Sequence, residues 1–215
     1  MSLQFNADGT FKILQVTDFH MTWLGSLFVR DFLYDLAKRE RPDLFVLTGD
    51  NVTDQVGTPA LRRTRVCKAI HHVMRIFDKI YRDFGTPVTM VPGNHDAEAH
   101  CITRQEQFDV YAEHKSFIGV ADPQADAGTR SLHGPHYGTH NLLIHDKSGA
   151  KPVFNLWMFD SGDVAADFVR GDGLGPDEDC VQKPQVDWFK AKTPRWAACR
   201  PWRSSTSLCR KFLIS

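Results

Sequence analysis

Residues 44–51 read Leu-Phe-Val-Leu-Thr-Gly-Asp-Asn, a short apolar run followed at once by a glycine and an acidic residue. A continuous apolar run of this length is typical of a strand that is buried on both faces of a parallel sheet. Residues 11–16 and 87–91 are similar runs that also end at polar residues. Between the three runs, residues 26–39 and 59–83 carry apolar side chains near a 3.6-residue period, which predicts helices. Alternating strands and helices with right-handed crossovers predict a parallel α/β sheet.

The second half of the chain has a different pattern. Two apolar runs, 141–145 and 153–159, flank a polar turn and predict a β-hairpin. The remaining segments predict long loops at 120–138 and 171–179 and a short helix at 185–192. The fold class is therefore α/β, with a parallel half and an antiparallel half.

Composition limits the class of protein. A chain of 215 residues with 42% apolar and 24% charged residues is typical of one globular domain, and its length also fits two small domains. Its formal net charge of zero gives no reason to expect a nucleic-acid or anionic-membrane partner. The N-terminus lacks a signal-peptide pattern, no apolar stretch approaches the roughly 20 residues of a membrane span, and the five cysteines are irregularly spaced. We therefore expect a cytoplasmic protein without a membrane partner.

Each strand of the first half is followed by a polar cluster: Asp18-Phe19-His20, then Gly49-Asp50-Asn51, then Gly93-Asn94-His95-Asp96. Loops that leave the carboxyl ends of neighbouring parallel strands converge at one edge of the sheet, where ligands bind. Carboxylates, imidazoles and an amide form a suitable donor set for a divalent cation. Two residues apart in an extended segment, Asp18 and His20 are expected to face the same side and chelate one ion. Each cluster alone is a weak signal, but the three in this order are specific.

The order D-x-H, G-D-x, G-N-H-D closely resembles the calcineurin-like metallophosphoesterases, and the resemblance covers roughly residues 11–193. Other details resemble a branch related to short purple-acid-phosphatase-like proteins, namely Asn141 to Leu143, Asp160-Ser161-Gly162, and Gln185 with Trp188-Phe189. The resemblance implies a mixed β-sandwich flanked by helices. It also implies hydrolysis of phosphate mono- or diesters.

The resemblance further implies a pair of divalent metal ions. Asp18 and His20 would bind the first metal, Asp50 would bridge both, and Asn94 would bind the second metal and contact the substrate. Two cations about 3.5–4 Å apart stabilise the attacking and departing oxygens of a displacement at phosphorus. Where related phosphatases place an iron-binding tyrosine, Thr53 stands here, so Mn, Fe(II) or Zn is expected rather than a purple ferric centre.

His95 would act as the catalytic acid and protonate the leaving-group oxygen, or it would hold a phosphoryl oxygen, and Asp96 would orient His95 and raise its pKa. Three further residues are candidates for contacts with the substrate. His100 and Arg104 follow Asp96 closely, and His136 lies in a loop rich in glycine and histidine. For His136 the alternative is an ordinary solvated loop.

Residues 194–215 form an aberrant basic tail beyond an incomplete domain at 1–193. From Trp188 to Ser215 there are seven Lys or Arg and no acid, and no histidine follows His145. The family pattern implies a later His for the second metal and a Gly-His-x-His that supplies both metals, so three ligands are missing. We prefer a shift of reading frame near Thr193 over a genuinely divergent tail, because the shifted codons can encode an apolar strand that ends in His-x-Pro.

The expected function is therefore metal-dependent hydrolysis of phosphate esters that is impaired in this chain. A non-catalytic metal- or phosphate-binding remnant of the enzyme is the main alternative. A nuclease of the same family is a second alternative, although residues 1–187 contain no evident basic, aromatic-lined groove.

Overall fold

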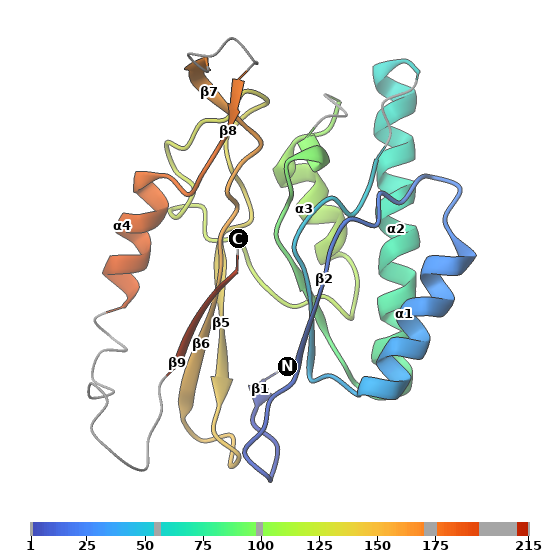
Figure 1. Ribbon diagram of the computed structural model, residues 1–215, viewed down its shortest axis with the longest axis vertical. Helices are drawn as coiled ribbons and strands as arrows, with labels where there is room; N and C mark the ends of the chain where they lie inside the picture. Colours follow the sequence, from blue (N-terminus) through green and yellow to red (C-terminus); the bar gives the residue numbers. More distant parts are fainter. Residues whose placement is uncertain (1, 54–56, 98–100, 170–175, 194–209, 215) are drawn as a thin grey trace.

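The computed structural model describes residues 2–53, 57–97, 101–169, 176–193 and 210–214. Two β-sheets face each other, and helices cover the outer face of each sheet (Figure 1). Apolar side chains of both sheets share one core between them, including Val46 of one sheet and Leu156 of the other. This arrangement confirms the predicted mixed β-sandwich flanked by helices.

The first sheet has the order β2-β3-β4 and is wholly parallel among these strands. Its strands are β2 (Ile13–Val16), β3 (Leu44–Leu47) and β4 (Val88–Met90). Every residue of the central strand β3 is buried, as the continuous apolar run predicts. All three strands fall within the ranges predicted from the sequence.

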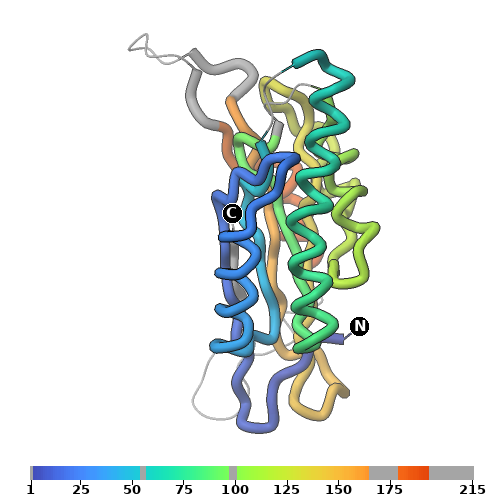
Figure 2. Tube along the Cα trace, turned by 90° about the vertical axis from the view of Figure 1, so that its right-hand side faces the viewer, coloured from blue at the N-terminus to red at the C-terminus, as the bar shows by residue number. Residues whose placement is uncertain are grey.

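Two long helices, α1 (Leu27–Glu40) and α2 (Pro59–Phe84), run side by side on the outer face of this sheet (Figure 2). Each begins at a hydroxyl side chain that accepts a hydrogen bond from the first turn, Ser26 for α1 and Thr58 for α2. Their apolar faces meet β3 in the largest core of the molecule. Both predicted helices are therefore confirmed.

The second sheet has the order β1-β5-β6-β9. The predicted hairpin is confirmed as β5 (His140–His145) and β6 (Pro152–Met158), which pair antiparallel. Two strands were not predicted, β1 (Leu3–Gln4) and β9 (Arg210–Ile214), and both pair in parallel. Strand β9 lies within the predicted aberrant tail, whose other residues, including those of the frame-shift interpretation, are outside the described residues.

Five further elements complete the described chain. Helix α3 (Arg104–Ala112) was not predicted, and helix α4 (Lys183–Lys192) begins two residues before its prediction. A short 3-10 helix, η1, spans His95–Ala97. The strands β7 (Val164–Val169) and β8 (Pro176–Glu178) pair antiparallel, so the predicted loop at 171–179 is wrong for β8. Within the described residues, no helix is long and apolar enough to span a membrane.

Candidate metal centre

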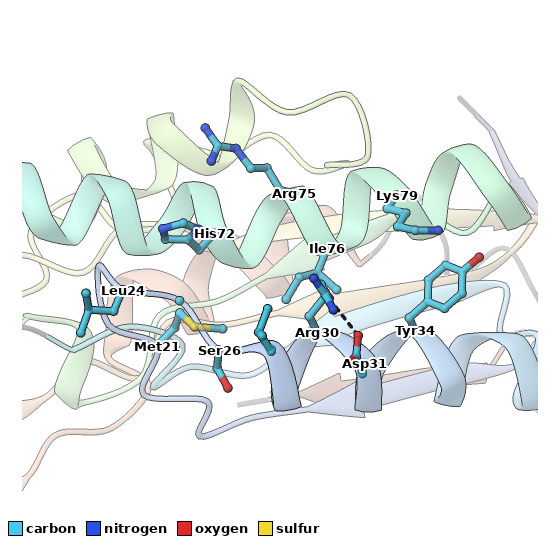
Figure 3. Close-up of a pocket in the computed structure, with 12 residues that line it drawn as sticks. Met21, Leu24, Ser26, Arg30, Asp31, Tyr34, His72, Arg75, Ile76 and Lys79 are labelled. Carbon is cyan, nitrogen blue, oxygen red and sulfur yellow. Dashed lines mark hydrogen bonds and ion pairs between the residues drawn. The ribbon is translucent and has the colours of Figure 1, made fainter.

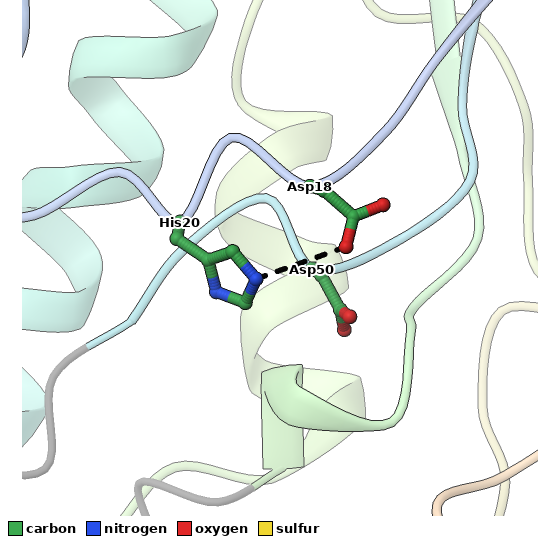
Figure 4. A group of neighbouring side chains, drawn as sticks. All are labelled: Asp18, His20 and Asp50. Atoms are coloured by element: carbon green, nitrogen blue, oxygen red, sulfur yellow. Dashed lines mark ion pairs between the residues drawn. The ribbon is translucent and has the colours of Figure 1, made fainter.

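Asp18, His20 and Asp50 meet where β2 and β3 end (Figure 4). One donor atom of each side chain lies within 4.8 Å of the others. The His20 Nε2 is 3.8 Å from the Asp18 Oδ1, and both side chains are exposed to solvent. The parallel register of β2 and β3 places the two loops side by side, which brings these three predicted ligands together.

The backbone at all three residues is left-handed, with φ of 58° at Asp18, 42° at His20 and 53° at Asp50. Among described residues other than glycine, only Arg41, at the C-terminal cap of α1, shares this property. The prediction that Asp18 and His20 lie in an extended segment is therefore wrong, although their side chains do converge. A left-handed backbone costs a residue with a side chain about 1–2 kcal/mol. Strain of this kind concentrates at functional sites.

Two glycines allow the second and third polar clusters to touch. A Cβ atom on Gly49 would lie 2.3 Å from the Gly93 Cα, and one on Gly93 would lie 2.3 Å from the Asp50 Oδ1. Neither position has room for any side chain. The glycines therefore set how closely the loop after β4 approaches Asp50.

His95 lies beside the cluster on this loop. Its backbone N–H donates a hydrogen bond of 2.9 Å to the Asp50 Oδ1. Its ring meets the ring of His20 edge to face, with centroids 5.5 Å apart. Because the amide of His95 takes one oxygen of Asp50, the carboxylate is oriented before any cation binds.

The Asp96 carboxylate faces backbone amides rather than the ring of His95. It accepts hydrogen bonds from Gly93 at 2.8 Å, Asp50 at 2.9 Å and Val52 at 3.5 Å. Burial raises the pKa of Asp96 to about 6. The prediction that Asp96 orients His95 is not supported, since both of its oxygens are committed to these amides. Asp96 instead ties the loop after β3 to the loop after β4.

Helix α3 holds the same loop from the other side. The Gln107 side chain donates a 2.5 Å hydrogen bond to the Asp96 carbonyl, and the Arg104 guanidinium donates a 3.2 Å bond to the Gly93 carbonyl. Both side chains are buried. Sequence reasoning missed Gln107, which a Thr103–Glu106 capping box could have placed on a helix.

Arg104 is therefore a structural residue rather than a substrate contact. Its side chain is 4% exposed and pairs with Asp160 at 3.0 Å and Asp163 at 3.7 Å. The prediction that Arg104 reaches substrate is not met by this arrangement, because buried carboxylates and a carbonyl already engage the guanidinium. Asp160, which belongs to the Asp160-Ser161-Gly162 motif, is the buried partner of the Arg104 guanidinium.

The other substrate candidates differ in outcome. His136 is buried, and its Nε2 lies 2.7 Å from the Asp179 Oδ2, so it belongs to an internal polar network and not to an open site. His100 is outside the described residues. Asn94 is half-buried in the loop after β4, between Gly93 and His95, which keeps it adjacent to the cluster.

The chemistry of the donor set fits a divalent cation. Two carboxylates and one imidazole meet at a solvent-exposed edge, and such oxygen and nitrogen donors suit Mn, Fe or Zn. Within the described residues this is the one group of three or more His, Cys, Asp or Glu side chains with that geometry.

A family model described as calcineurin-like phosphoesterase matches residues 11–193. The chain belongs to the calcineurin-like phosphoesterase family. It is 29% identical to a protein of Arabidopsis thaliana named "Probable inactive purple acid phosphatase 14", over 90% of this chain and 49% of the relative. It is 27% identical to "Probable inactive purple acid phosphatase 28" of the same plant, over 91% of this chain and 49% of that relative.

Membership of the calcineurin-like phosphoesterase family confirms the resemblance drawn from the three polar clusters. All three lie within the matched residues. The chain spans about half the length of the curated relatives it matches.

Proposed function

We propose that this chain binds divalent metal at Asp18, His20 and Asp50 and uses the site to hydrolyse phosphate mono- or diesters. The observation that carries the proposal is the convergence of these donors on a strained backbone. The left-handed backbone at Asp18, His20 and Asp50 costs the fold several kcal/mol in total, at about 1–2 kcal/mol for each residue. Proteins retain a strained backbone of this kind where it orients functional groups.

Each residue of the site has a role that follows from its position. Asp18 and His20 would hold one cation, Asp50 would be a ligand of both cations, and Asn94 would be a ligand of the second. The metal, when bound, supplies Lewis-acid stabilisation of the charge that develops on the phosphoryl oxygens. His95, exposed beside the cluster, donates a proton to the leaving-group oxygen.

The donor set favours Mn, Fe(II) or Zn. Thr53 stands where a phenolate ligand of a ferric centre is expected. Without a phenolate, a coloured ferric site has no strong anionic ligand beyond the carboxylates.

A second candidate is a non-catalytic protein that binds metal or phosphate. Two observations favour it. The named relatives are called probable inactive phosphatases. Only three His, Cys, Asp or Glu donors converge within the described residues, and an incomplete ligand set weakens metal affinity and geometry.

Hydrolysis of a generic aryl phosphate by the metal-loaded chain separates the two. His95→Gln is expected to lower turnover by about 10²-fold or more, because the general acid is lost, while metal binding persists. His145→Gln, in β5, is the matched control and leaves turnover unchanged. Turnover that survives His95→Gln contradicts the role of His95. Metal binding without turnover in the unaltered chain supports the non-catalytic candidate.

A further inference from the structure

A short segment that precedes and opens α1 carries four large apolar side chains at the surface. Trp23 is 37% exposed, Leu24 71%, Leu27 69% and Phe28 78%. Side chains of this size are costly to leave in water, at roughly 25 cal/mol per Å² of apolar surface. Clustered exposure of this kind marks an interaction site.

The segment is held in place, so its exposure is not a consequence of a loose loop. His72 of α2 hydrogen-bonds the Trp23 carbonyl at 3.0 Å. A Cβ atom on Gly25 would lie 3.3 Å from the His72 ring, so the turn packs against α2. Ser26 then caps α1 by accepting a 3.2 Å hydrogen bond from Val29.

The helix behind this segment is strongly basic. Helix α2 contains seven Lys or Arg and two Asp, so its side chains carry a net charge of +5 (7 − 2). The Arg65 guanidinium lies 5.1 Å from the centroid of the Trp23 ring. Lys68 and Arg75 are exposed, and neither has an ion pair among the described residues.

A groove joins the apolar and the basic groups. It has a volume of about 510 Å³ and lies between α1 and α2, with Leu24 and Leu27 among the residues that line it. Figure 3 shows that its basic side chains come from both helices, Arg30 from α1 and Arg75 from α2. Asp31, the one acid that lines the groove, is paired with Arg30 at 2.8 Å.

We propose that this face binds an anionic lipid surface, with the apolar side chains of residues 23–28 in the interface and Lys68 and Arg75 of α2 at the headgroups. Apolar side chains flanked by Lys and Arg are the pattern of proteins that lie on a membrane. The expectation of no membrane partner rested on the lack of a spanning segment and on a net charge averaged over the chain, and that average conceals the charge of α2. Charge complementarity favours an anionic bilayer over a second copy, which would bring two α2 helices of like charge together.

Co-sedimentation of the full chain with lipid vesicles tests this surface without reference to the metal site. The chain is expected to bind phosphatidylcholine vesicles that contain about 30 mol% phosphatidylserine, and to bind pure phosphatidylcholine much less. Leu24→Ser with Phe28→Ser is expected to weaken binding about tenfold or more, since two apolar side chains that would enter the lipid interface are lost. The matched control replaces Val120 and Leu132 by Ser. Both are exposed apolar residues outside the segment, and their loss leaves binding unchanged.

A second pair of variants tests the charge independently. Lys68→Gln with Arg75→Gln is expected to weaken binding to the anionic vesicles about fivefold per cation. Circular dichroism confirms that each variant is folded. Absence of vesicle binding, or equal binding to both lipid compositions, overturns the proposal. So does binding of a labelled oligonucleotide in place of vesicles, or a dimer that Leu24→Ser with Phe28→Ser dissociates.

Discussion

The backbone amide of Asp50 donates a 2.9 Å hydrogen bond to the buried carboxylate of Asp96. The amide of Gly93 donates to the same oxygen at 2.8 Å. One side chain therefore fixes the distance between the loops that follow β3 and β4. The Gln107 side chain donates a hydrogen bond to the carbonyl of Asp96 from the opposite side. The position of the loop after β4, beside the candidate metal centre, therefore depends on helix α3.

Gln107→Ala tests this dependence. The variant leaves the Asp96 carbonyl without its partner, and we expect metal affinity to fall about 10–100-fold, as for residues that support metal ligands. Isothermal titration with Mn²⁺ or Zn²⁺ measures the change. Gln105→Ala, an exposed position on the same helix, is the matched control. Equal affinity in both variants contradicts the positioning role.

Asp18→Gly and Asp18→Ala separate backbone strain from ligand function. Glycine adopts the left-handed backbone of Asp18 (φ of 58°) at little cost, whereas alanine does not. We expect the glycine variant to be more stable by about 1 kcal/mol, while both variants lose metal affinity. Urea unfolding in the absence of metal gives the comparison. Equal stabilities would show that the backbone at this position relaxes.

Arg104→Met distinguishes a structural role from a substrate contact. It leaves the carboxylates of Asp160 and Asp163 buried without their cation, and we expect a loss of about 3–5 kcal/mol in unfolding free energy. Adding Asp160→Asn to the same chain is expected to recover part of this loss, because one uncompensated charge is removed. A stable Arg104→Met variant with only a raised KM would instead support a substrate contact.

His140 predicts a specific dependence of stability on pH. Burial lowers the pKa of His140 from 6.5 to about 4, so the unfolded chain binds this proton at a higher pH than the folded chain. The contribution of neutral His140 to the free energy of unfolding is complete above about pH 6.5. Below that pH it falls by about 1.4 kcal/mol per pH unit, down to about pH 4. The stability gap between the unaltered chain and His140→Gln should therefore shrink by about 2 kcal/mol from pH 7 to pH 5. A gap that does not change with pH would show that the buried ring gains its proton as readily as in the unfolded chain.

Periodic apolar residues predicted the elements whose stability comes from the core. Strand β3 and helix α2 bury continuous or regularly spaced apolar side chains, so their positions were evident. Helix α3 was not predicted, because two of its buried residues are the polar Arg104 and Gln107. These side chains are buried through hydrogen bonds to distant partners, and a hydropathy pattern does not register such bonds.

For the candidate site too, some features followed from the sequence pattern and others did not. The identity of Asp18, His20 and Asp50 followed from polar residues at strand ends, because parallel strands end at one edge. Their left-handed backbone did not follow, since the sequence pattern of a strand end does not specify the turn after it. The assignments of Arg104 and His136 to substrate were unsupported for a related reason. Their buried carboxylate partners, Asp160 and Asp179, lie far away in sequence.

Metal binding by the unaltered chain and by Asp50→Asn tests the central claim most directly. Asp50 lies in the loop after β3, and one of its oxygens is already oriented by the backbone amide of His95 in the loop after β4. We predict saturable binding of Mn²⁺ or Zn²⁺ to the unaltered chain, with a rise in melting temperature, and a loss of about 100-fold in affinity for Asp50→Asn. Binding of equal affinity in both chains, or no binding in either, would contradict a metal centre at Asp18, His20 and Asp50.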